Sequence, residues 1–380
     1  MRVIPAIESV TAVLPGFWFG VIAVLWAGFF LLEGFDFGVG VLLPWVGGDE
    51  TGRKVALRAI GPVWDGNEVW LLVAGGATFA AFPAWYASMF AGLYIPLALI
   101  LAGLIVRGIS IEYRSKVATA TGRAWCDRGM FVGSLLPALL FGVAFADLIR
   151  GLHMNADHQV TGGFFDLVTP FGLLGGLVSL GFFSYHGAVF LTLRTEGPVR
   201  DRAHRAARLL ALPVVVAAAG FLAWSLAWRG GAVSVAVSAL MAVALIISIL
   251  LDRRGREGLS FASSAVVAVA FPVFVFASLW PDVIPARNHA AWSLTVHNAS
   301  SSHYTLVVMT VVALIFTPIV LVYQAWGYWV FRARVSEGTV NPVARLPRPA
   351  VSASDAYQVT SPPDLPGAGK DASVAGERGD

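Results

Sequence analysis

Nine apolar stretches, each long enough to cross a lipid bilayer as a helix, organise this 380-residue chain. A membrane span needs roughly 20 mostly apolar residues to cross the hydrocarbon core. Inside lipid, backbone polar groups must be paired within the protein, which favours helices over irregular chain. The sequence therefore predicts an all-α, polytopic membrane protein, with spans at about 16–43, 60–81, 84–106, 129–149, 165–192, 206–228, 232–251, 259–281 and 304–331.

The composition agrees with this class. Charged residues make up 13% of the chain and hydrophobic residues 57%, whereas soluble domains carry roughly 25% charged residues. The single cysteine, Cys126, excludes a disulfide within the chain and a multi-cysteine metal site. The first apolar run is longer than the core of a cleaved signal peptide, so we expect a retained helix. Nothing in the composition indicates a nucleic-acid partner.

Basic residues orient the predicted spans. The positive-inside rule places the loops rich in Lys and Arg in the cytoplasm. Only Arg2, Arg150, Arg229 and Arg287 fall on the other side. The N-terminus is then outside and the C-terminus cytoplasmic, which requires an odd number of spans and agrees with nine. The basic loops carry Arg53, Lys54, Arg58, Arg107, Arg114, Lys116, Arg123, Arg128, Arg194, Arg200, Arg202, Arg205, Arg208, Arg253, Arg254 and Arg256.

The end of the chain differs in composition from the rest. Residues 336–380 are rich in Pro, Ser, Ala, Gly and Asp, and such a segment buries too little apolar area to fold alone. We therefore expect a transmembrane domain over 1–335 and a disordered cytoplasmic tail over 336–380.

Four carboxylates fall near the cytoplasmic halves of the first two spans. Glu33 and Asp36 lie three residues apart, and so on one helix face; Asp65 and Glu68 flank the amide Asn67. Ionisable residues at membrane depth are costly and usually mark an ion or proton route. The four carboxylates therefore predict a proton-conducting or charge-compensating cluster. The alternative is an interfacial position, solvated or paired with Arg53, Lys54 or Arg58.

Other polar residues have simpler interpretations. Glu112 can reach Arg107 or Lys116 by helical spacing, and Asp147 with Arg150 forms a local pair at a helix end. His186 lies inside a span, where a packed histidine bonded to a hydroxyl or carbonyl is favoured over a haem ligand. No phosphate loop, nucleophile elbow or His-x-x-x-His spacing is present. We therefore predict no catalytic and no metal-ligating residue in this chain.

An ordered series of motifs resembles subunit II of the cytochrome bd quinol oxidases. It covers roughly 16–335 and begins with Glu33-Gly-Phe-Asp-Phe-Gly-Val-Gly40 and Pro62-Val-Trp-Asp-Gly-Asn-Glu-Val-Trp70. The later members are Ala74-Gly-Gly-Ala77, Phe79-Ala-Ala-Phe-Pro83, Arg107–Lys116, Gly142–Phe145, Thr169–Gly176, Ser293–Ser302, Met309-Thr310 and Tyr323–Trp329.

The resemblance implies a fold and partners. The fold would be two four-helix bundles plus one peripheral helix, in a bacterial cytoplasmic membrane. The chain would pair with a haem-bearing subunit I and, in some members, a small single-span subunit. The complex would oxidise quinol and reduce oxygen to water without pumping protons. Haem b, haem d and the quinol site would lie on subunit I, and this chain would bind no cofactor covalently. Some members also hold a structural quinone, and membrane lipids would surround the complex.

The resemblance also implies roles for individual residues. Asp65 and Trp64 match a proton-path pair at the subunit contact, and Glu112 matches a family acid on that path. Glu33 and Asp36 would support the same path.

Trp70 matches a tryptophan on an oxygen route, and Asn67 and Glu68 would lie at the subunit contact. Two other functions remain open, a carboxylate-coupled secondary transporter and a purely structural membrane subunit. A transporter would favour broken helices in two matching halves, which the sequence does not display.

Overall fold

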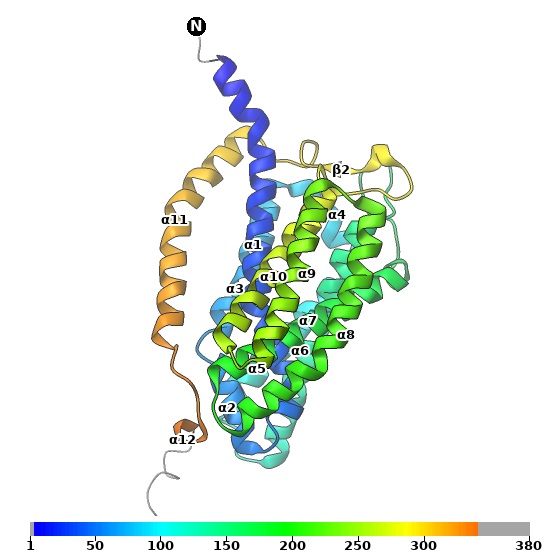
Figure 1. Ribbon diagram of the computed structural model, residues 1–380. Helices are drawn as coiled ribbons and strands as arrows, with labels where there is room; N and C mark the ends of the chain where they lie inside the picture. Colours follow the sequence, from blue (N-terminus) through cyan, green and yellow to red (C-terminus); the bar gives the residue numbers. More distant parts are fainter. Residues whose placement is uncertain (1–3, 341–380) are drawn as a thin grey trace, which may run out of the picture. The chain divides into compact units, whose positions relative to one another are not determined.

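The computed structural model describes residues 4–340, with side chains from residue 13 onward, and these residues are almost entirely helical (Figure 1). The predicted tail of 336–380 lies outside the described residues except for 336–340. The helices are α1 (Ile4–Val46), α2 (Glu50–Ile60), α3 (Trp64–Ala81), α4 (Pro83–Gly92), α5 (Tyr94–Arg114), α6 (Ala120–Arg150), α7 (Pro170–Arg194), α8 (Pro198–Arg229), α9 (Ala232–Arg253), α10 (Glu257–Leu279), α11 (His303–Val330) and α12 (Glu337–Val340), with 3-10 turns at Phe164–Leu167 and Ala290–Trp292.

Eight helices within residues 4–340 are long and apolar enough to cross a membrane, which confirms the polytopic all-α class. They are α1 and α5–α11. Helix α3 has 18 residues, and its first turns carry Asp65 and Glu68, so it is less apolar than the others. Counting α3 gives the predicted nine spans, and that number and the orientation stay predictions.

Local sequence signals set where the helices begin. The side chains of Asp49 and Thr119 accept hydrogen bonds from backbone N–H groups in the first turns of α2 and α6. Thr169 does the same for α7, with Pro170 at the first helical position. Such caps satisfy N–H groups that have no partner within the helix. Gly197 has φ of +68° just before Pro198, a conformation that favours glycine, and it lets the chain reverse into α8.

We refer to α1, α3, α5 and α6 as the first helix group and to α7–α10 as the second. Helix α1 packs against α3 and α6 of its own group and equally against α7 and α10 of the other. The predicted division into two four-helix bundles and one peripheral helix therefore stays a prediction. Gly38 of α1 meets Gly187 and the backbone oxygen of Phe183 on α7, where an added methyl group would overlap both. These glycines bring two helix backbones into contact.

One predicted hairpin differs from the structure. The short turn at Phe82-Pro83 indicated that 60–81 and 84–106 pack as antiparallel neighbours. Instead, the second stretch breaks at Leu93 into α4 and α5. Helix α3 packs mainly on α1 and α5 mainly on α6. Two short antiparallel strands, β1 (Asp282–Ile284) and β2 (Leu294–Thr295), were also not predicted.

Helix α11 is peripheral and touches the rest of the protein near its two ends (Figure 1). Near its start, the indole N–H of Trp18 donates to Leu306 O at 3.2 Å and to the Thr310 hydroxyl at 3.1 Å. Near its end, Gln324 and Tyr328 bond to α3. Leu306 is the one buried residue among those of α11.

Candidate functional site

Glu33 on α1 and Arg107 on α5 form an ion pair inside the first helix group. Arg107 Nη1 donates to Glu33 Oε1, and both side chains are fully buried. Among residues 4–340, Glu33 Oε2 and the Nε and Nη2 atoms of Arg107 have no hydrogen-bond partner. A buried pair of this kind holds its charges only while both partners are present.

Aromatic rings and a glycine enclose the Arg107 side chain. Its guanidinium lies 4.9 Å from the Phe37 ring centre and 5.9 Å from that of Trp64. Gly133 on α6 leaves room for it, since an added Cβ there would lie 2.8 Å from the Arg107 Cβ. Trp64, predicted beside a proton route, therefore lies beside a buried cation, a favourable arrangement for an aromatic ring.

Asp36, one helical turn after Glu33, has different partners. Its Oδ2 accepts from Asn67 Nδ2 at 2.7 Å, and its Oδ1 has no partner among the described residues. Asn67 Oδ1 accepts from the Tyr328 hydroxyl at 2.8 Å and from Gln324 Nε2 at 3.1 Å. One amide thus joins α1, α3 and α11. No cation among the described residues pairs with Asp36, so a change in its charge breaks no ion pair within this part of the chain.

The two carboxylates of α3 lie nearer the surface than Asp36 does. Asp65 is exposed and Glu68 is half-buried. Glu68 interacts electrostatically with Asp65 on one side and with Asp36 on the other. The three acids therefore run from the surface at the start of α3 to the buried Asp36. Of the four carboxylates, only Asp65 has the exposed position that the interfacial alternative requires.

The other predicted site residues, Glu112, Asn67 and Trp70, each have their own surroundings. Glu112 is exposed and lies 3.8 Å from Lys116, as its spacing predicted. Asn67, expected at a subunit contact, is fully buried and bonded within this chain. Trp70 is half-buried and packs on Gly28 of α1, where a methyl group would overlap its ring.

A large apolar hollow opens beside α3, where it is lined by Leu71, the residue after Trp70, and not by Trp70 itself. It has a volume of about 600 Å³ and lies among α3, α4, α5 and α6. Gly75 and Gly76 line it, and each has open space where a side chain would begin. The rest of the wall is mostly aliphatic and aromatic, including Trp26, Leu72, Phe79, Leu101 and Phe145.

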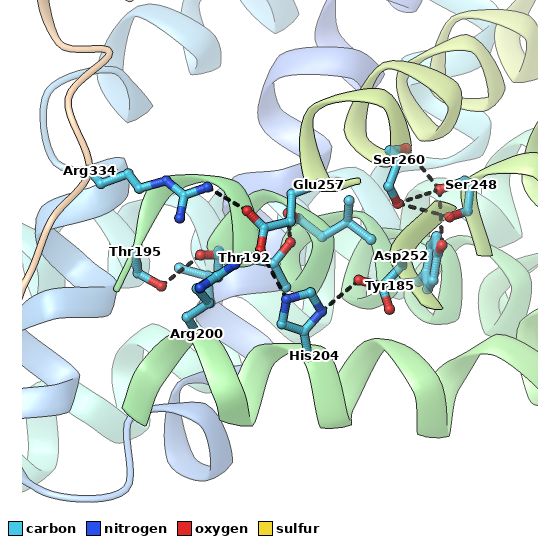
Figure 2. Close-up of polar contacts among 12 residues, drawn as sticks. Tyr185, Thr192, Thr195, Arg200, His204, Ser248, Asp252, Glu257, Ser260 and Arg334 are labelled. Carbon is cyan, nitrogen blue, oxygen red and sulfur yellow. Dashed lines mark hydrogen bonds and ion pairs between the residues drawn. The ribbon is translucent and has the colours of Figure 1, made fainter. Parts of the chain in front are cut away.

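A second polar cluster lies where α8, α9 and α10 meet (Figure 2). Glu257 accepts from Arg200 Nη2 at 2.5 Å, from Arg334, and pairs with His204 Nε2 at 3.1 Å. His204 Nδ1 lies 2.8 Å from Asp252. The cluster ties the segment after α11 to the second helix group, and sequence reasoning missed it because its members are far apart in the chain.

A third cluster joins α2, α5 and α6. Arg114 pairs with Asp127 at 2.5 Å and with Glu50 at 2.9 Å, and Arg53 lies 3.3 Å from Asp127. Partial burial raises the pKa of Glu50, but its bonds to Arg114 and the charge of Arg123 outweigh burial and hold that pKa below its usual range. Arg53 and Lys54 are thus engaged with Asp127 and Glu50, not with the carboxylates of α1 or α3.

Two histidines, His186 and His204, have both ring nitrogens engaged and are not placed as axial haem ligands. His186 is fully buried, with Nδ1 at 2.8 Å from the Ser264 hydroxyl and Nε2 at 3.2 Å from Leu31 O, so both ring nitrogens are engaged as predicted for a packed histidine. Both nitrogens of His204 face carboxylates. Across residues 4–340, no group of three or more His, Cys, Asp or Glu side chains is placed to hold a metal ion.

These features define a polytopic helical membrane protein with buried carboxylates near one end of its first helix group. The sequence profile of cytochrome bd terminal oxidase subunit II matches residues 14–331. The chain belongs to this family. This membership decides against the secondary transporter.

Individual relatives agree. The chain is 39% identical over 330 residues to the cytochrome bd ubiquinol oxidase subunit 2 of Bacillus subtilis, covering 86% of this chain and 98% of the relative. It is 35% identical over 367 residues to the cytochrome bd-I ubiquinol oxidase subunit 2 of Escherichia coli, covering 87% and 97%. The fold is similar to a chain of the bd oxidase from Geobacillus thermodenitrificans, with a TM-score of 0.63, 17% identity, and coverage of 88% and 98%.

The family places this chain in a multi-pass complex of the bacterial cytoplasmic membrane, beside a subunit I, in an oxidase that contains haem.

Proposed function

We propose that this chain carries part of the proton-uptake route of a quinol-oxidising, oxygen-reducing complex, through Asp65, Glu68 and Asp36. Reducing oxygen to water consumes protons, and a dry interior requires titratable groups to lead them in. The observation that carries the proposal is Asp36: fully buried, held through one oxygen by Asn67, and without a cation partner among the described residues.

The three acids have successive roles in this route. Asp65 collects protons at the surface at the start of α3, and Glu68, half-buried, passes them toward Asp36. Asn67 fixes the Asp36 carboxylate in place, while the Glu33–Arg107 pair braces α1 against α5 beside it. Glu112 pairs with Lys116, and it serves as a second surface acid for proton collection.

The test is steady-state oxygen consumption by the whole complex with quinol as donor. Asp36→Asn removes the titratable group and keeps the shape, so turnover should fall on the order of 10²-fold, the lower range for a lost proton-transfer group. Asp201→Asn, an exposed acid in the first turn of α8, is the matched control and should leave turnover unchanged. Normal turnover and normal haem absorbance in Asp36→Asn would leave this chain a purely structural subunit.

The apolar hollow beside α3 suits a second role, oxygen access. Oxygen is small and apolar, and the hollow offers about 600 Å³ of apolar space. Gly76→Leu should fill part of it and raise the KM for oxygen, with kcat kept at saturating oxygen. Gly20→Leu, also at an open position but on α1 outside the hollow, is the control. An unchanged KM in the Gly76 variant would remove the hollow from the route.

Subunit I is the proposed holder of haem b, haem d and the quinol site. The support is the engaged state of His186 and His204 in this chain. The relatives' names point to ubiquinol as a donor, and a structural quinone or a small third subunit remain further proposals for this complex.

A further inference from the structure

The middle of α11 is uncovered on every side. Residues 314–323 are all exposed. Ten residues make nearly three helical turns, so the face toward the rest of the protein is as open as the outer face. In a membrane, exposed apolar side chains such as Leu314, Ile319 and Val322 lie against the hydrocarbon chains of lipids.

A hollow of about 350 Å³ lies where α11 ends. Its apolar wall includes Phe190 of α7, Phe261 of α10 and Phe331, which directly follows α11. Tyr328, bonded to Asn67, also lines it. The hollow therefore lies between the end of α11 and helices α2, α7 and α10, at the end of the protein where the basic loops gather.

Two arginines at this hollow have no acidic partner among the described residues. Arg194 donates to the Phe331 carbonyl, and Arg332 donates to the Trp329 carbonyl at 2.6 Å. Both side chains line the hollow and keep further N–H groups free to donate. Arg334, the third arginine of the wall, is paired with Glu257.

We propose that an anionic phospholipid binds here, with its headgroup at Arg194 and Arg332 and its acyl chains along residues 314–323 of α11. Arginine forks match phosphate oxygens geometrically. Basic pockets at helix ends on the cytoplasmic side suit acidic headgroups. The aromatic wall and the uncovered middle of α11 suit the glycerol and chains. The lipid then braces α11 against the helices that hold Asn67. This site goes beyond the proton route and does not depend on it.

The test quantifies lipids that stay with the purified complex. Phosphatidylglycerol and cardiolipin are measured by mass spectrometry after washing in detergent. The double variant Arg194→Gln with Arg332→Gln should bind anionic lipid roughly 30-fold more weakly, given two lost basic contacts. It should lose about one such lipid per complex. Lysine at both positions should keep the lipid, and Arg254→Gln, an exposed arginine after α9, should have no effect.

Photolabelling covers the case in which the double variant does not assemble. A photoreactive phosphatidylglycerol is added to the unaltered complex, and labelled peptides are identified. We expect labels on α7 near Phe190, on α10 near Phe261 and on α11, competed by phosphatidylglycerol and not by phosphatidylcholine. Equal lipid retention in all variants, or labels absent from these peptides, would overturn the site.

Discussion

Replacing Glu33 with Gln leaves the Arg107 guanidinium in a fully buried position without its counter-charge. Breaking a buried ion pair by removing one partner costs about 3–5 kcal/mol. The upper part of this range applies here, because Arg107 Nε and Nη2 have no other partner among the described residues to offset the lost charge. Replacing both residues with apolar ones of similar volume, Glu33→Leu with Arg107→Met, should cost far less, since no charge is left buried.

The assay is a double-mutant cycle on the equilibrium unfolding of the purified complex, with Glu33→Leu and Arg107→Met made singly and together. We expect a coupling free energy above about 2 kcal/mol between positions 33 and 107. The control is Glu112→Gln, which removes the exposed pair with Lys116 and should change stability by less than about 0.5 kcal/mol. If the losses of the two single variants simply add in the double variant, the pair does not stabilise the fold in the way described.

Three further predictions concern packing, anchoring and acid sensitivity. Gly38→Ala should reduce assembly of the complex, measured by size-exclusion chromatography, because its methyl group overlaps the backbone of α7, whereas Gly20→Ala at an open position should not. Tyr328→Phe should cost about 1 kcal/mol, the worth of one hydrogen bond, and hydrogen exchange at the end of α11 should increase. The pKa of Glu50 is held low by Arg114. The stability that this carboxylate provides is therefore present above its unfolded pKa and is lost as the pH falls through its folded pKa. Glu50→Gln should flatten this part of the acid-unfolding profile, and an unchanged profile would contradict the assignment of this effect to Glu50.

Much of the fold was predictable because lipid restricts the choices. The lengths of the apolar runs predicted the spans, whereas the close packing of Gly38 against α7 could not be assigned from sequence, because small-residue spacings are common in helical membrane proteins. The break at Leu93 was not visible, because an apolar run carries no signal for the point where one helix stops and the next begins. The small strands β1 and β2 lie in an irregular loop whose pairing depends on distant contacts.

The sequence predicted which carboxylates belong to the site but not which residues they pair with. Glu33 and Asp36 share one helix face, yet Glu33 meets Arg107 of α5 and Asp36 meets Asn67 of α3. Helical spacing allowed Glu112 to pair with either Arg107 or Lys116; Glu112 lies beside Lys116, and Arg107 pairs with Glu33 instead. Gln324 and Tyr328 belong to the motif Tyr323–Trp329, but nothing in it indicated a bond to Asn67, since a polar residue near a helix end is usually an interfacial anchor.

Proton uptake during a single turnover tests the route most directly. The fully reduced complex, in liposomes, is mixed with oxygen, and proton uptake from the side of the basic loops is followed with time. The route predicts that Asp36→Asn delays uptake on the order of 10²-fold, while oxygen binding at the haem keeps its normal rate and Asp201→Asn behaves as the unaltered complex. Uptake at the normal rate in Asp36→Asn would contradict the route through this chain.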